Sequence, residues 1–167
     1  MSRGFVKDGD QEEVPMVPKR AFLPDGVPNF VTRNGLEQLL SEKEALIRER
    51  ENLGISNENE KRIAVNFINA KLQLLNNRIT DARVIDTGDQ PHDEVTFGAT
   101  VTIRLGSARK VQTFQIVGVD EADISKGKIS FISPLARALL NHKNGEKIVL
   151  KREKEEFVYE IAAISYV

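Results

Sequence analysis

The feature that most constrains the fold is a pair of apolar stripes with helical spacing, separated by a short turn-like break at residues 54–57. The first stripe follows Thr32, whose hydroxyl can accept a hydrogen bond from an early helical N–H. It contains Leu36, Leu39, Leu40, Leu46, Ile47 and Leu53 and is interrupted by Lys43 and Arg50. The second contains Ile63, Ala64, Phe67, Ile68, Lys71, Leu74, Leu75, Arg78, Ile79 and Ala82. Steps of three and four residues place each stripe on one helical face, as in a coiled-coil seam.

Two helices of similar length joined by a short polar turn can each bury a stripe against the other. Residues 32–83 are therefore predicted to form an antiparallel helical hairpin, a coiled coil whose tip lies near residues 54–59. A first helix of about 20 residues would extend about 30 Å. Packing of both helices onto the downstream residues as ordinary core elements is the alternative, but narrow stripes between heavily charged flanks favour a projecting hairpin.

From about residue 84 the apolar period shifts to two and turn residues become frequent. The candidate strands are residues 94–104, 111–119, 128–132, 147–151 and 157–166. One helix interrupts them, because Ser133 can cap a helix whose first position, Pro134, needs no N–H donor. Residues 84–167 are predicted to form an antiparallel sheet with one helix, which makes the chain α+β.

The first 31 residues show no sustained period. Prolines at positions 15, 18, 24 and 28 remove backbone donors and favour extended geometry. Acidic residues cluster ahead of them at Asp8, Asp10, Glu12 and Glu13. Residues 1–31 are therefore predicted to be a flexible, proline-containing acidic extension.

Composition excludes several functions. The chain has no cysteine, and its two histidines, His92 and His142, stand far apart in loop sequence, so neither a zinc site nor a thiol nucleophile is expected. No apolar run approaches the length of a membrane span, and no secretory signal is recognisable, so a cytoplasmic protein is expected. A net charge of −1 lacks the basic footprint of a DNA-binding protein, so any contact with nucleic acid is expected to be indirect, through a protein partner.

Five blocks of the sequence, taken together and in order, closely resemble the C-terminal domain of the GreA/GreB transcript cleavage factors. The blocks are residues 82–86, 95–102, 116–123, 127–130 and 133–139. The resemblance implies an FKBP-like fold for residues 84–167, a preceding helical hairpin and a monomeric protein. It also implies a role in bacterial transcription elongation, with RNA polymerase as partner. In that family the C-terminal domain grips the rim of the polymerase secondary channel, and the hairpin enters the channel.

The polymerase-binding residues that this resemblance implies are Asp120, Glu121, Asp123, Ser133 and Pro134. A loop fixed by proline and a capped helix is ordered before binding, which lowers the entropic cost of association. The alternative is that these residues only shape a turn and start a helix. The two interpretations are compatible, since a rigid turn can also be a contact.

In the family, two acidic residues at the hairpin tip help the polymerase hold a second Mg²⁺, in a motif that reads Gly-Asp, two variable residues, then Glu-Asn. Here Gly54, Glu58 and Asn59 match, but Ile55 replaces the aspartate and cannot bind a hard cation. Glu60 could substitute, although it would point about 200° around a helix from Glu58. The first helix also looks shorter than in the family's cleavage factors by roughly three turns, or ~16 Å.

The tip candidates are therefore Glu58, Asn59 and Glu60, and the chain is expected to hold no cofactor of its own, Mg²⁺ being at most shared with the polymerase. The favoured hypothesis is a polymerase-binding elongation regulator, with the sign of regulation left open. A stimulator of transcript cleavage through Glu58 is the second, and even then the chain would not be an enzyme by itself. A peptidyl-prolyl isomerase is the third; it rests on the FKBP-like fold alone and needs an aromatic-lined pocket.

Overall fold

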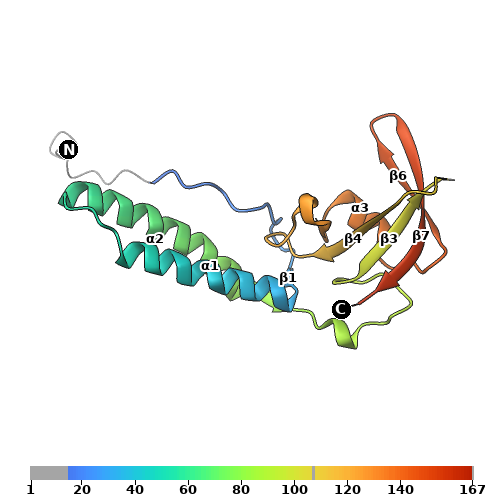
Figure 1. Ribbon diagram of the computed structural model, residues 1–167, viewed down its shortest axis with the longest axis horizontal. Helices are drawn as coiled ribbons and strands as arrows, with labels where there is room; N and C mark the ends of the chain where they lie inside the picture. The colour runs from blue at the N-terminus through green and yellow to red at the C-terminus, as the bar shows by residue number, and fades with distance from the viewer. Residues whose placement is uncertain (1–14, 107, 167) are drawn as a thin grey trace.

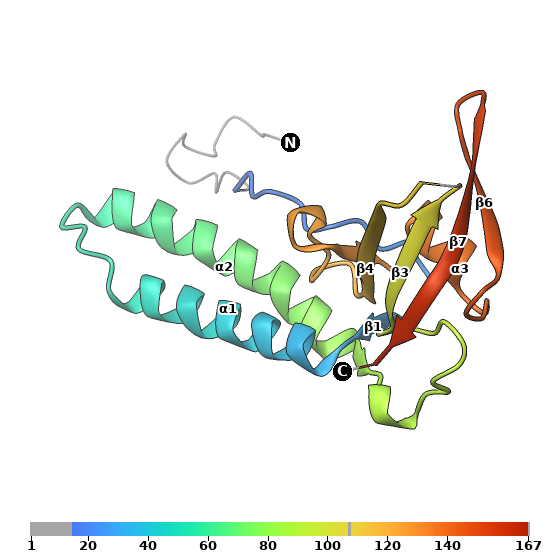
Figure 2. The same cartoon turned by 45° about the vertical axis from the view of Figure 1, so that its right-hand side comes forward.

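The structure, a computed structural model, describes residues 15–106 and 108–166. Two long helices lie side by side and project from a β-sheet part that carries a third, short helix (Figures 1 and 2). The mixed α+β class predicted from the sequence is confirmed, whereas the FKBP-like topology stays a prediction. Within the described residues, no helix is both long enough and apolar enough to cross a membrane.

The projecting part, the helical hairpin, consists of α1 (Arg33–Glu51), α2 (Glu58–Asp81) and the turn between them. Thr32 caps α1 as predicted, because its side chain accepts a hydrogen bond from the Gly35 N–H. Helix α2 begins several residues before its apolar stripe, since the Asn57 side chain caps it. The helices are held together by apolar residues that are buried or half-buried along their facing sides, including Leu39, Ile68, Leu72 and Leu75.

The larger sheet has the strand order β5-β4-β3-β7-β6. Its strands are β3 (Thr100–Leu105), β4 (Val111–Val117), β5 (Lys128–Ser130), β6 (Lys147–Arg152) and β7 (Glu155–Ser165). Three of its pairings are antiparallel, but β4 and β5 pair in parallel, so the prediction of a wholly antiparallel sheet was wrong. The chain can make this parallel pair because residues 118–127, which include the 3-10 helix η4 (Ile124–Lys126), turn it back before β5 starts.

Helix α3 (Pro134–Leu139) packs its buried residues Ala136 and Leu139 against the sheet. Ser133 caps it through a hydrogen bond from the Ala136 N–H, as predicted.

The strand predicted for residues 94–104 starts later than expected, at Thr100. Its first residues form turns around Gly98, whose φ of +91° favours glycine, and only Thr100–Leu105 enter the sheet.

A second, two-stranded sheet was not predicted. In it β1 (Asn29–Val31) pairs in parallel with β2 (Ala82–Val84), after which the chain continues through the 3-10 helix η3 (Thr87–Asp89). Residues 29–31, which were predicted as the end of a flexible extension, form this strand, and Val31 is buried with Leu39 and Leu75. The acidic cluster in residues 8–13 lies outside the described residues.

Strand β1 also connects the hairpin to the larger sheet. The Phe30 ring packs between Phe97 and Phe131, with ring centroids 6.0 Å and 5.5 Å away. Next to it, the Phe30 carbonyl oxygen approaches Gly118 so closely that a Cβ on Gly118 would lie 2.5 Å from it. Glycine at position 118 therefore permits the contact between β1 and the loop after β4.

The close approach of the Phe30 carbonyl oxygen leaves no room for a side chain at position 118. Gly118→Ala should lower the free energy of unfolding by about 1–3 kcal/mol, because either β1 or the loop must move to admit the methyl group. Urea denaturation would measure the change. Gly54→Ala is the matched control: a Cβ there meets nothing within 4 Å, so it should change stability by less than about 0.5 kcal/mol. Equal stability of the two variants would contradict the tight packing of β1 on the loop.

Candidate functional site

The base of the hairpin meets the larger sheet at the loop of residues 118–123, which follows β4. The loop turns sharply, because the N–H groups of Glu121 and Ala122 both donate to the Gly118 carbonyl oxygen, at 3.2 Å and 3.1 Å. The turn places two consecutive carboxylates, Asp120 and Glu121, in different surroundings. Both belong to the polymerase-binding set expected from the sequence.

The Asp120 carboxylate binds two arginines from different parts of the chain. Arg20 Nε donates to Asp120 Oδ1 at 3.0 Å, and Arg78 Nη1 of α2 donates to Asp120 Oδ2 at 3.4 Å. Arg20 also binds Glu42 of α1 through both terminal nitrogens, at 3.1 Å and 2.9 Å, and Arg78 donates to the Ala21 carbonyl oxygen. The Asp120 side chain is only 7% exposed, so its charge is neutralised inside the protein.

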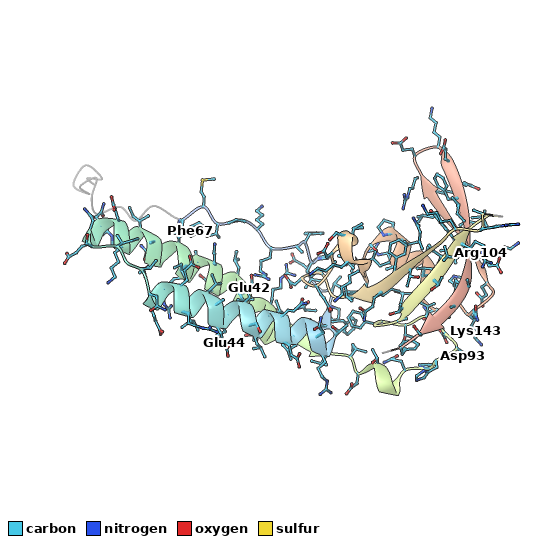
Figure 3. The ribbon with its side chains drawn as sticks, viewed as in Figure 1. Glu42, Glu44, Phe67, Asp93, Arg104 and Lys143 are labelled. Carbon is cyan, nitrogen blue, oxygen red and sulfur yellow. The ribbon has the colours of Figure 1, made fainter. Side chains whose placement is uncertain are left out.

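The carboxylates of Asp120 and Glu42 hold the Arg20 guanidinium in place. Burial alone would lower the pKa of Arg20, but the hydrogen bond to Glu42 and the charge of Asp120 outweigh it, and the pKa is raised above its usual value. Glu42 extends from α1 toward this junction (Figure 3) and remains 44% exposed. The cluster thus joins the N-terminal segment, both helices of the hairpin and the loop after β4.

The Glu121 carboxylate lies at the N-terminus of α1. It accepts hydrogen bonds from Thr32 Oγ1, from Asn34 Nδ2 at 3.0 Å and from Lys128 Nζ of β5 at 3.1 Å. A negative charge there complements the positive end of the helix dipole. Gly35 makes room for it, because a Cβ on Gly35 would lie 2.7 Å from Glu121 Oε1. The side chain, 3% exposed, therefore fixes the start of α1 to the larger sheet.

The remaining residues of the expected set, Asp123, Ser133 and Pro134, lie near the two ends of the edge strand β5. Asp123 pairs with Lys128 at its start, and the Ser133 N–H donates to the Ser130 carbonyl oxygen at its end. Pro134 is exposed, and Ser133 is half-buried. The structure therefore brings these three residues to one edge of the sheet.

Asp123 is also fixed in position, as the cap of η4. Its carboxylate accepts hydrogen bonds from the hydroxyl and the N–H of Ser125, at 2.6 Å and 3.0 Å. The hydroxyl bond is the main cause that lowers the pKa of Asp123, so this carboxylate stays charged near neutral pH. Next to it, Ile124 is 76% exposed, so the edge presents a fixed charge beside an apolar side chain.

The tip candidates Glu58, Asn59 and Glu60 are all exposed in the first turn of α2. The Asn57 side chain accepts from the N–H groups of Asn59 and Glu60, and Asn59 Oδ1 accepts from Arg62 at 2.9 Å. Across residues 15–106 and 108–166 there is no group of three or more His, Cys, Asp or Glu side chains placed to hold a metal ion. The tip therefore offers single carboxylates and a capped helix.

Sequence reasoning missed the partners of Asp120 and Glu121. Arg20 and Arg78 carry no local signal, because one stands between prolines and the other within a charged helix. Lys128 belongs to a block that resembled the family, but nothing in the sequence paired it with Glu121. Only Thr32 was singled out in advance, as a helix cap.

The fold and this site define a class of small α+β proteins in which a helical hairpin is fixed through an acidic loop to a sheet. Residues 90–166 match the family model described as "Transcription elongation factor, GreA/GreB, C-term". Residues 90–166 are therefore similar to the C-terminal part of GreA/GreB elongation factors.

Individual relatives show the same similarity. The chain is 42% identical over 101 residues to transcription elongation factor GreA of Francisella tularensis subsp. novicida (strain U112), and to GreA of subsp. tularensis (strain SCHU S4 / Schu 4). Each match covers 60% of this chain and 63% of the relative, so the chain spans less than two thirds of these relatives' length.

Solved structures are similar at lower identity. GreA factor homolog 1 (Gfh1) of Thermus thermophilus is 21% identical, with a TM-score of 0.39 over 83% of this chain and 99% of that one. A GreA/GreB elongation factor from Nitrosomonas europaea is 22% identical, with a TM-score of 0.43 over 82% and 98% of the two chains.

Removal of the Glu121 carboxylate tests the structural role of this loop. Glu121→Ala should lower the free energy of unfolding by about 2–3 kcal/mol, because three donors lose a buried charged acceptor. Urea denaturation would measure it. Glu37→Ala removes an exposed carboxylate on α1, and it should change stability by less than about 0.5 kcal/mol. A Glu121 variant as stable as the Glu37 variant would show that the loop does not hold α1.

Proposed function

We propose that this protein binds bacterial RNA polymerase at the rim of its secondary channel and regulates transcript elongation. The observation that carries the proposal is the family match, since residues 90–166 contain every residue of the expected docking set. Such a partner would place the protein in the bacterial cytoplasm and bring it to nucleic acid only through the polymerase complex. The protein would act there as a monomer.

The geometry refines which residues make the contact. The carboxylates of Asp120 and Glu121 already have partners inside the protein, so we assign them the role of positioning the hairpin. The docking surface is then the edge around β5, formed by Asp123, Ser133 and Pro134. Rigid capped turns at both ends of an edge strand are ordered before binding, which lowers the entropic cost of association.

The hairpin would enter the channel as a regulator. Helix α1 has 19 residues and thus extends about 28 Å from the sheet. At its end Ile55 occupies the position of the family's aspartate, and Glu58 and Glu60 lie where acidic residues complement a helix N-terminus. An occupied channel without a metal-binding pair at the tip favours regulation over cleavage.

Stimulation of transcript cleavage is the second candidate, and exposed Glu58 at the tip is the observation that favours it. One carboxylate could add a ligand to a Mg²⁺ ion held mainly by the polymerase. The catalytic groups would still be the polymerase's own, so the chain would not be an enzyme by itself.

The peptidyl-prolyl isomerase hypothesis finds little support. Phe97 and Phe131, which contact one another in the β part, are packed against Phe30 of the same chain. The open cavity of about 630 Å³ between α1 and the sheet has no aromatic residue in its lining. Neither place offers a proline-containing peptide the aromatic walls that this activity needs.

Docking is tested by Ser133→Glu combined with Pro134→Ala. The double variant should bind the polymerase about tenfold more weakly, because it loses the α3 cap and changes the proposed contact at once. Affinity for the cognate core polymerase can be measured by fluorescence anisotropy. Ser133→Thr keeps a capping hydroxyl and should bind normally, as should Lys154→Ala at the turn beyond the opposite edge of the sheet. Unchanged affinity of a folded double variant would overturn the docking surface.

The tip is tested by release of RNA from a stalled, backtracked complex of the cognate polymerase. If the protein is a regulator, it should not accelerate cleavage, and Glu58→Ala should behave as the wild type. Binding measured in parallel shows that the factor is present on the complex. Acceleration that Glu58→Ala abolishes, but Glu51→Ala on the end of α1 does not, would establish the cleavage function instead.

A further inference from the structure

The N-terminal segment of residues 18–23, here called the brace, crosses the junction between the hairpin and the larger sheet. It forms no regular secondary structure, yet in both views it runs beside the helices toward the β part (Figures 1 and 2). With side chains of α1, α2 and the loop after β4 it lines a cavity of about 410 Å³. The brace therefore lies against both helices of the hairpin and against the loop after β4.

One side chain makes the decisive contacts. Arg20 binds Glu42 of α1 through two hydrogen bonds and Asp120 of the loop through a third. We propose that the brace fixes the angle at which the hairpin leaves the sheet. The hydrogen bonds of Arg20 to Glu42 and Asp120, here called the pin, hold the brace in place and can be broken.

The position of Glu42 along α1 determines how strongly the pin resists tilting of the helix. The other contacts described between the hairpin and the sheet lie near the base of the hairpin: those of Phe30, of Glu121 with Thr32, and of Asp120 with Arg78. Glu42 lies ten residues beyond Thr32, about 15 Å along the helix. A contact at that distance resists tilting of the helix, whereas contacts at the base act mainly as a pivot.

The charges make release possible. When Arg20 leaves, Asp120 keeps Arg78 as a partner, at 3.4 Å. Glu42, already 44% exposed, returns to water. Release therefore leaves no buried carboxylate without a cation, which is the state that makes the breaking of most buried ion pairs costly. The half that binds Glu42 is open to solvent, so salt should weaken the pin.

The absence of cysteine from the sequence allows a direct test on the full chain. Ser56→Cys at the hairpin tip and Lys154→Cys at the β6–β7 turn, both exposed, accept spin labels whose separation is measured by double electron–electron resonance. With Arg20 intact, one narrow distance distribution is expected. Arg20→Ala should broaden it and shift its mean. Arg20→Lys should give an intermediate width, because an ammonium group lacks the fork that spans both carboxylates.

Lys19→Ala is the matched control, because it removes an exposed neighbouring cation and should leave the distribution narrow. Glu42→Gln weakens the pin from the α1 side and should broaden it, and high salt should broaden the distribution of the parent protein but not of Arg20→Ala. Narrow, unshifted distributions for both Arg20→Ala and Glu42→Gln would overturn the proposal and leave the base contacts as the sole determinants of the angle. The measurement needs no polymerase, so its failure is separate from failure of the docking proposal.

Discussion

The structure depends on two adjacent carboxylates that point to different elements. Asp120 binds Arg20 and Arg78, while Glu121 binds Thr32, at the start of α1, and Lys128. Because they are consecutive, the loop carrying them cannot move without disturbing both sets of partners. Gly118 lets the same loop contact the backbone of β1. Besides the contacts of Phe30, a few residues of this one loop connect the hairpin to the larger sheet, and the orientation of the hairpin depends on how those residues are paired.

The main effect of these pairs is on geometry. Transfer of charges out of water costs much of what their attraction returns, so buried ion pairs contribute little net stability. Their hydrogen bonds are nevertheless directional, and each partner comes from a different element. Apolar contacts such as those of Val31 with Leu39 and Leu75 supply the stability of the hairpin base. The charged groups then select one arrangement among the several that apolar packing would tolerate.

Sequence reasoning predicted what depends on local pattern. Thr32 and Ser133 cap helices where predicted, because a cap acts on N–H groups only two or three residues away. Strand β1 was missed, since three residues after a proline-rich segment have no period to detect, and their partner strand begins more than fifty residues later. The resemblance identified Asp120 and Glu121, but it could not show that Arg20, in a segment expected to be flexible, would neutralise one of them.

The two ends of the hairpin differ in the same way, because the tip is held by contacts between residues close in sequence and the base by contacts between residues far apart. At the tip every polar contact is local: Asn57 caps its own helix and Asn59 binds Arg62. The tip is therefore organised by contacts within α2 and its cap. At the base the contacts include pairs of residues as far as 100 positions apart, so distant parts of the chain determine the geometry there. The proposed occupation of a channel would require a defined hairpin shape, and the contacts at the base are the ones that determine it.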